Sequence, residues 1–301
     1  MRLLSVLLII IVSYNVENLF HPAHDSLKDD YEWTPEGERR WSYTRYYRKE
    51  ENIARVLTNI GEWEGVDIVG LQEIENALVV KRLCYTLRRG EYDFVHYESP
   101  DRRGIDVALI YKKARVDTIC TRAIRVDLGE ETTRDILYVC AKIKVNGERL
   151  SVSGDTIHFF VCHMPSQRGG KAESEWKRER AKRVLQEAVD SVFRVSPEAK
   201  IVVMGDMNSE PKEDIIGLNN RMNELTSERG THKYRGEWTC LDQFYISESL
   251  DSISHVRIYD AEWIQETDEK YMGLKPKRTY NGYRYQNGYS DHLPIILECQ
   301  K

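Results

Sequence analysis

Several apolar, strand-like segments of this sequence end in polar side chains that can hold a metal ion or move a proton. The clearest case is KIVVMGDMNSEP, in which an apolar run is followed directly by Asp206 and Asn208. Each such residue has an ordinary explanation by itself, because Asp and Asn form turns, Glu caps helices and single histidines often lie in cores. The pattern nevertheless recurs along the chain, and chance accounts poorly for the whole set. Its other members are Asn15, Glu73, Asp106, His163, Asp242, Asp291 and His292.

Cleavage of a phosphate ester needs these residue types together. Magnesium is held by carboxylate and amide oxygens and keeps several of its waters. The attacking water needs a base, and the phosphoryl oxygens need a charge-stabilising donor, which suits two histidines with acidic partners. The sequence lacks a GxxxxGK[ST] loop, a GxGxxG loop and a Ser or Cys nucleophile with a base at motif spacing. We therefore predict metal-assisted hydrolysis by water.

Alternating strands and helices must position these side chains. Apolar runs predict strands at residues 66–72, 105–111, 135–145, 156–164, 200–206, 240–247 and 293–299. Spacing of apolar residues along one face predicts helices at residues 50–63, 76–90 and 174–192. Many strands with few helices, and no visible linker or repeat, indicate large sheets covered by helices in one domain.

The composition narrows the classes of function. The 301 residues are 41% hydrophobic and 31% charged, with a net charge of −5. Such a chain does not bind nucleic acid by charge alone, since that binding depends on Lys and Arg neutralising phosphates. A bound metal could still supply local positive charge. The six cysteines are scattered without the spacing of a zinc site, so we expect reduced thiols in the core.

The N-terminal segment, residues 1–12, has two interpretations. Its apolar run from Leu3 to Val12 resembles the core of a signal peptide, but it is too short to span a bilayer and no small-x-small cleavage site follows it. The run is rich in Ile and Val near its end, as a buried strand would be. We favour a first core strand that overlaps or follows signal-like residues, which leaves both a cytoplasmic and an exported protein open.

Four motifs, SYNVENLF, GLQEIE, GDMNSEP and SDHLPI, occur in the order and roughly at the separations seen in the endonuclease/exonuclease/phosphatase superfamily. The resemblance covers about residues 6–299, and GDMN followed by SDH is its most specific part. It implies one domain over residues 6–301, with an α/β (α+β) fold. The expected architecture is a four-layer α/β/β/α sandwich of two packed, mainly antiparallel sheets flanked by helices. It also implies a phosphoric ester hydrolase that uses Mg²⁺, or Mn²⁺ in its place.

The resemblance implies a metal site and a group that activates water. Asn15 and Glu73 would hold the metal ion, and Asp291 would lie near it. Asp206 would orient or deprotonate the attacking water. Asn208 would bind a phosphate oxygen and fix Asp206.

The resemblance also implies roles for two histidines. His292 would contact the scissile phosphate and would be oriented by Asp242, which explains a carboxylate within the apolar segment CLDQFYI. His163 matches the histidine of the DNase I and phosphatase branches, where a carboxylate is its partner. Asp106 precedes its strand at a suitable place to be that partner.

Departures from particular branches bear on the substrate. The exonuclease III branch has an aromatic residue or Asn in place of His163, and the inositol polyphosphate phosphatases have an Arg after the aspartate that corresponds to Asp242. YNVENLF with LQEIEN looks most like bacterial proteins of the superfamily that are described as nucleases and are often exported. We therefore predict a nuclease acting on DNA or RNA. The alternatives are a phosphatase or phosphodiesterase for a small or lipid headgroup phosphate, and a non-catalytic binding protein on the same scaffold.

Basic and aromatic segments could bind the substrate. ESPDRRGID precedes one strand, MPSQRGGKAE follows another, and residues 271–291 interleave tyrosines with Lys and Arg. Such interleaving fits base stacking and backbone contact on single strands, although solvated loops or tyrosines packed on the sheet would look the same. We expect a monomer without an obligate protein partner. The candidate substrate-binding residues are Arg103, Arg168, Lys171, Arg284 and Tyr289.

Overall fold

A computed structural model of the chain describes residues 8–145, 148–149, 156–167, 170–211, 215–223, 225, 230–251 and 253–300. Its helices are η1 (Tyr31–Trp33), α1 (Tyr43–Gly61), α2 (Ala77–Arg88), α3 (Lys171–Val195), α4 (Glu248–Asp251) and η2 (Glu262–Ile264). Its strands are β1 (Leu8–Leu19), β2 (Ile68–Ile74), β3 (Tyr92–His96), β4 (Asp106–Lys112), β5 (Val116–Ile124), β6 (Ile136–Val145), β7 (Glu148–Arg149), β8 (Thr156–His163), β9 (Lys200–Asp206), β10 (Asn219–Asn220), β11 (His232–Tyr234), β12 (Glu237–Thr239), β13 (Asp242–Ile246), β14 (Ser254–Ile258), β15 (Gln265–Thr267), β16 (Leu274–Pro276), β17 (Tyr280–Asn281), β18 (Arg284–Tyr285) and β19 (Ile295–Gln300).

Two large sheets form the centre of the molecule. The first has the strand order β14-β19-β1-β2-β4-β3, and the second has the order β10-β13-β9-β8-β6-β5, with β7 paired to β6. The pairs β1–β2 and β8–β9 are parallel, and the other neighbours along these two orders are antiparallel. A parallel pair needs a long crossover, and α1 and α3 lie in these two crossovers.

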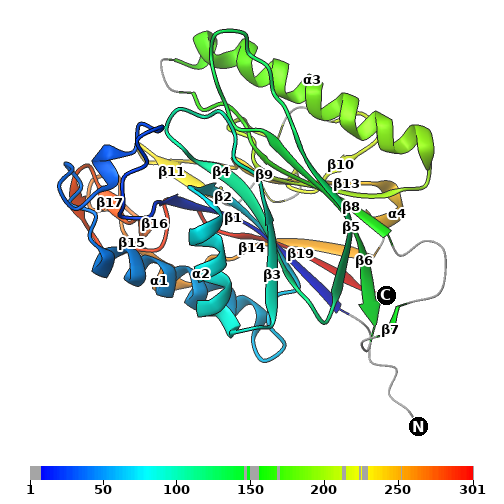
Figure 1. The fold of residues 1–301 in the computed structure, drawn as a ribbon, viewed down its shortest axis with the longest axis horizontal. Helices are drawn as coiled ribbons and strands as arrows, with labels where there is room; N and C mark the ends of the chain where they lie inside the picture. Colours follow the sequence, from blue (N-terminus) through cyan, green and yellow to red (C-terminus); the bar gives the residue numbers. More distant parts are fainter. Residues whose placement is uncertain are drawn as a thin grey trace.

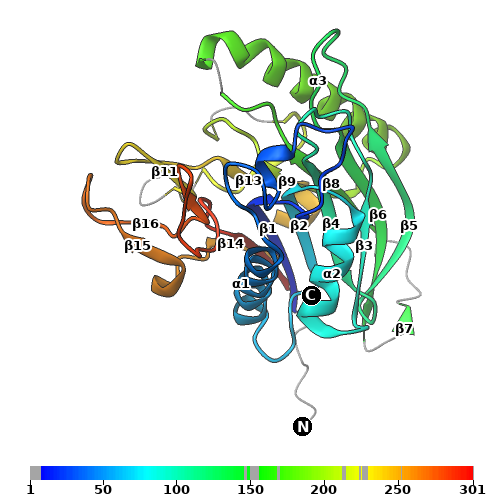
Figure 2. The ribbon, with the colours of Figure 1, turned by 60° about the vertical axis from the view of Figure 1, so that its left-hand side comes forward.

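The sheets and helices form four layers. Figures 1 and 2 show α1 and α2 on the outer face of the first sheet and α3 on the outer face of the second. Three apolar cores lie between successive layers, in the order helices α1 and α2, first sheet, second sheet, helix α3. The predicted sandwich of two packed, mainly antiparallel sheets flanked by helices is confirmed.

Local sequence signals explain where the long helices begin. Ser42 caps α1 by accepting a hydrogen bond from the Arg45 N–H, and Asn76 caps α2 by accepting from the N–H groups of Leu78 and Val79. The apolar stripe of α1 then faces the first sheet, since these residues recur at helical spacing and are buried. They are Ile53, Val56, Leu57 and Ile60.

The N-terminal apolar run continues into a central strand. β1 begins at Leu8 and pairs with β19 on one side and β2 on the other, which agrees with the expected first core strand; residues 1–7 lie outside the described residues. No helix in the described part of the chain combines the length and apolar character needed to cross a membrane. One domain over residues 6–301 stays a prediction.

Candidate active site

Three site residues form a row across adjacent strands of the second sheet. His163 ends β8, Asp206 ends β9 and Asp242 begins β13, and the register pairs Asp206 with both of the others. Residues paired across neighbouring strands point to the same face. Alternation from Met204 and Phe244, which lie in the core between the sheets, places this row on the face toward the first sheet. The sequence predicted the residues, and the pairing register explains how they meet.

Residues from the first sheet complete the row. Asn15 on β1 donates its side-chain N–H to Asp206 Oδ2 at 3.1 Å. His292, just before β19, lies with Nδ1 2.7 Å from Asp242 Oδ2 and with Nε2 3.9 Å from Asp206 Oδ2. His163 Nε2 lies 3.6 Å from the same Asp206 oxygen. Asp206 is therefore the centre of a group that both sheets supply.

Asn208 fixes the turn that follows Asp206. Its backbone has φ of 50°, in the left-handed region that Asn tolerates, and its N–H donates to Asp206 Oδ1 at 2.9 Å. Its side-chain amide donates to the Met164 carbonyl at 3.0 Å, which ties this turn to the segment after His163. The amide has two N–H donors, so one remains available for a phosphate oxygen.

The pKa values of Asp206 and His292 are both raised, but for different reasons. Burial, with the Asp242 and Glu73 carboxylates, raises the pKa of Asp206 to about 7 against the opposing effect of His292. For His292, burial lowers the pKa, but the charge and hydrogen bond of Asp242 outweigh it and hold the pKa well above its usual range. A potential proton acceptor and a charged donor thus lie side by side near neutral pH.

Glu73 lies at an irregular point of β2. The register of β2 shifts between Gln72 and Ile74, and Glu73 has φ of 65°. This bulge turns its carboxylate toward β1, where Glu73 Oε2 accepts from the Asn18 N–H at 2.8 Å. Its negative charge also contributes to the raised pKa of Asp206.

Asp291 belongs to a partly buried network of charges that the sequence did not reveal. Arg278 binds Asp291 Oδ2 at 2.6 Å and lies 3.6 Å from Glu17 Oε1. Lys49, on α1, donates to Thr279 Oγ1 and to the Tyr289 carbonyl. Burial raises the pKa of Asp291, but Arg278 and the nearby histidines lower it to about 2, so this carboxylate is ionised at neutral pH.

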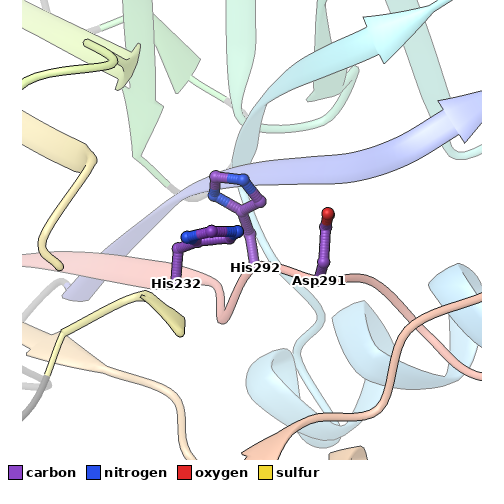
Figure 3. A group of neighbouring side chains, drawn as sticks. All are labelled: His232, Asp291 and His292. Carbon is purple, nitrogen blue, oxygen red and sulfur yellow. The ribbon is translucent and has the colours of Figure 1, made fainter. Parts of the chain in front are cut away.

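Figure 3 shows a second histidine beside His292. The His232 ring lies against the His292 ring at 4.9 Å between centroids, and Asp291 lies next to them. One ligand atom from each of these three residues lies within 4.8 Å of the others. Burial and the charge of His292 lower the pKa of His232 to about 4. His232 is therefore neutral beside the charged His292 ring and does not compete with it for a proton.

A divalent cation fits this end of the sheets. Glu73 and Asp291 offer carboxylate oxygens and Asn15 an amide oxygen, the hard donors that magnesium prefers. Burial and repulsion from Asp291 raise the pKa of Glu17 to about 7, although Lys49 and Arg278 oppose this. Repulsion between Glu17 and Asp291 contributes to this shift after burial, and a cation bound beside them would reduce that repulsion. Metal binding by Asn15, Glu73 and Asp291 stays a prediction.

Asp106 has a different partner from the one predicted. It faces His96, with Asp106 Oδ2 3.6 Å from His96 Nε2, and its Oδ1 accepts from the Ser99 N–H. The reason is the alternation of β4. Val107 and Leu109 lie in the core between the sheets, so Asp106 points to the opposite, helix-covered face, away from the row that contains His163. The expected pairing of Asp106 with His163 is therefore corrected.

The predicted substrate-binding residues are dispersed. Tyr289 is only 8% exposed and packs edge-on against Trp263 at 5.1 Å, so it is a core residue and cannot stack on a base. Arg284 is exposed on β18. Arg103 lies near Asp101, at 3.8 Å. Arg168 lies outside the described residues, and Lys171 is described only as the first residue of α3.

Sequence reasoning missed several residues of this region. Lys49 is 1% exposed and lies three residues after buried Tyr46 and four before buried Ile53. A lysine at this spacing falls within the apolar face of the helix, and the sequence could have indicated a buried charge there. Glu17, Arg278 and His232 carried no comparable signal. Their neighbours lie hundreds of positions away or in irregular loops.

Comparison with known proteins places the chain in a family. The model of the Endonuclease/Exonuclease/phosphatase family matches residues 10–301. No curated protein matches the chain at a significant level. A humanized TDP2 of D. rerio is similar in structure at 16% identity, covering 97% of this chain and 98% of that chain with a TM-score of 0.61.

Two further solved structures share the fold. A mannosyl-6-phosphatase of Bacteroides thetaiotaomicron is 16% identical, with 96% of this chain and 98% of that chain covered and a TM-score of 0.56. D. rerio TDP2 in complex with a single-strand DNA product is 18% identical, with 97% and 98% covered and a TM-score of 0.54. The match of the family model over nearly the whole chain, on the fold described above, confirms the resemblance of the motifs: the chain belongs to the endonuclease/exonuclease/phosphatase family.

Proposed function

We propose that this protein is a magnesium-dependent phosphodiesterase that hydrolyses DNA or RNA with an activated water. The observation that carries the proposal is the convergence of Asn15, Asp206 and His292 from two sheets, with Asp242 behind the histidine. Endonucleases, exonucleases and phosphatases all cleave phosphate esters, so the family supports the reaction class.

The residues divide the chemistry between them. Asp206 accepts the proton of the attacking water, while the hydrogen bonds from Asn15 and from the Asn208 N–H hold its carboxylate in place. His292, kept protonated by Asp242, donates a hydrogen bond to the phosphoryl oxygen on which negative charge grows. Water attacks in line with the leaving oxygen, and no covalent enzyme intermediate forms.

The cation adds electrostatic stabilisation. Held by Asn15 and Glu73, with Asp291 near it, magnesium would supply positive charge to the phosphoryl oxygens and the leaving group. Manganese has similar ligand preferences and is the natural substitute in assays.

Nucleic acid is the substrate class that we favour. The fold is shared with a TDP2 that holds a single-strand DNA product. Exposed Tyr283 with Arg284, on the hairpin of β17 and β18, offers an aromatic face and a cation of the kind that single strands bind. The alternative, a small phosphate ester, is favoured by the similarity to a mannosyl-6-phosphatase and by the burial of Tyr289.

One assay panel tests both the reaction and the substrate. Plasmid DNA, single-stranded RNA, bis-p-nitrophenyl phosphate and mannose 6-phosphate are compared in magnesium and in chelator. We expect magnesium-dependent cleavage of the diesters and a loss of roughly 10²–10⁴-fold in Asp206→Asn and in His292→Gln. His255→Gln, at an exposed position of β14, is the matched control. Faster turnover of mannose 6-phosphate would support the alternative, and full activity of Asp206→Asn would refute the mechanism.

A further inference from the structure

A second group of metal-binding side chains lies at the ends of β3 and β4. His96, the last residue of β3, pairs in register with Ala108 of β4, and Asp106 lies two residues from Ala108 on the same face. Glu98 follows His96 by two residues, so the continuing chain returns its side chain to that face. One ligand atom from each of His96, Glu98 and Asp106 lies within 4.8 Å of the others.

The two buried members of this group face each other without a hydrogen bond. The side chains of His96 and Asp106 are each 2% exposed, and His96 Nε2 lies 3.6 Å from Asp106 Oδ2. That separation is longer than a hydrogen bond. Neither atom has a hydrogen-bond partner among the described residues. Buried polar atoms are almost always satisfied, so an unsatisfied facing pair indicates an absent partner between them.

The separation fits a metal ion. Zinc lies about 2.0–2.2 Å from imidazole nitrogen and carboxylate oxygen, and two ligands of a tetrahedral ion at such distances are about 3.4 Å apart. Imidazole suits first-row transition metals, whereas magnesium prefers oxygen ligands.

We propose that His96, Glu98 and Asp106 bind a first-row transition-metal dication, with Zn²⁺ as the best match, at a site separate from the one proposed for magnesium. The two sites lie on opposite faces of the first sheet, because Asp106 points toward the helix-covered face and the row around Asp206 faces the second sheet. The site would serve to hold the segment between β3 and β4, which contains Arg103, against the sheet.

The surrounding charges leave room for such a cation. Glu98 and Asp106 bring two negative charges, and Lys28 brings one positive charge 3.8 Å from Glu98. Lys28 also donates to the Ser99 carbonyl, so it has a second partner when the metal takes the Glu98 carboxylate.

Zinc binding to the full chain, without an affinity tag, tests the site. After treatment with chelator, the protein is titrated with Zn²⁺ by calorimetry in excess magnesium, and its retained zinc is measured by elemental analysis. We expect one zinc per chain, and binding weaker by roughly tenfold or more in His96→Ala and in Glu98→Gln. The Glu98 side chain is 56% exposed, so we expect Glu98→Gln to fold. This variant therefore tests zinc binding even if His96→Ala does not fold.

Two controls separate this site from other zinc ligands. His255→Ala and Glu73→Gln should bind zinc as the wild type does, although Glu73→Gln loses magnesium-dependent cleavage if the proposed function holds. Cobalt substituted for zinc should give a spectrum without thiolate charge transfer, since no cysteine takes part. A wild type that binds no zinc, or a Glu98→Gln variant that binds it unchanged, would overturn the proposal.

Discussion

The Asp206 carboxylate and the His292 imidazole acquire opposite roles from one environment. Both side chains are buried, and burial disfavours charge on each. Asp242 lies 2.7 Å from His292 Nδ1, where its charge favours the protonated imidazole. The same negative charge disfavours ionisation of the neighbouring Asp206 carboxyl. One buried carboxylate therefore prepares a proton acceptor and a charged donor together.

The first prediction concerns the pH dependence of activity. Asp206 must be ionised to accept a proton, and its pKa is raised to about 7, so kcat/KM should fall as the pH drops through 7. A bound cation favours the carboxylate and would move this limb to lower pH. His292 must stay protonated, which places the other limb on the alkaline side. The measurement is kcat/KM against pH at fixed magnesium, and a flat profile from about pH 5 to 9 would contradict the assignment.

The second prediction concerns the buried Lys49. Replacing it by Met removes a cation that interacts with Glu17 and Asp291 and leaves their charges less compensated. We expect Lys49→Met to lower the free energy of unfolding by about 3–5 kcal/mol. Adding Glu17→Gln should recover part of that loss, because one of the two carboxylates is then neutral. Urea unfolding of the wild type, both single variants and the double variant, in chelator, gives the coupling energy; strict additivity would argue against the network.

The sequence predicted many residues of the candidate site, but it did not predict which side chains contact each other. Asp206, Asp242 and His292 could be identified because polar side chains interrupt or end apolar runs. The partner of Asp106 could not be read, since IDVALIY is apolar on both faces and gives no sign of which face meets the other sheet. The Arg278–Asp291 pair depends on the path of an irregular loop, which no periodicity encodes.

At the scale of elements, the parallel pair β8–β9 brings His163 and Asp206 together. Its close approach requires glycine at Gly205, where φ is 143° and an added Cβ would lie 1.9 Å from the Cys162 carbonyl oxygen. That glycine is therefore fixed by the adjacent strand and not by a turn.

The third prediction tests this contact. Gly205→Ala should destabilise the protein by on the order of 3 kcal/mol or more and lower activity, because the clash separates β8 from β9. Gly129→Ala is the matched control, since Gly129 also has positive φ, 77°, but an added Cβ there would meet no atom within 4 Å. Thermal unfolding of both variants gives the comparison. Equal losses of stability in Gly205→Ala and Gly129→Ala would show that backbone strain, and not the contact between β8 and β9, causes the destabilisation.

Element types were more predictable than element edges. The strand at residues 200–206 has the predicted bounds, because the apolar run and the strand coincide. α1 begins at Tyr43, ahead of the predicted start at residue 50, since its first turns are rich in Tyr, Arg and Lys and carry little apolar signal. β5 was missed because its surface is mostly polar or exposed, as suits an edge strand.

At the scale of the molecule, the candidate site exists only where two sheets meet. Neither sheet holds it alone: Asn15 comes from the first, Asp206 and Asp242 from the second, and Ser290 ties the loop before His292 to the Asn15 carbonyl. The distance between the sheets therefore sets the geometry of the group, and packing far from the site should affect it.

The fourth prediction tests the packing contact that holds the two sheets together. A Cβ added at Gly70 on β2 would lie 2.9 Å from the Sδ and Cε atoms of Met204 on β9. Gly70→Ala should therefore cost about 1–3 kcal/mol of stability through overpacking, and Met204→Ala about 2–5 kcal/mol through a cavity. The double variant should be more stable than the sum predicts, since the new methyl group occupies the vacated space. Urea unfolding gives the coupling energy. As a control, Gly70→Ala is combined with Leu185→Ala, in the core between the second sheet and α3, and the two losses of stability should add. A coupling energy of equal size in this control would mean that direct contact between Gly70 and Met204 does not cause the coupling.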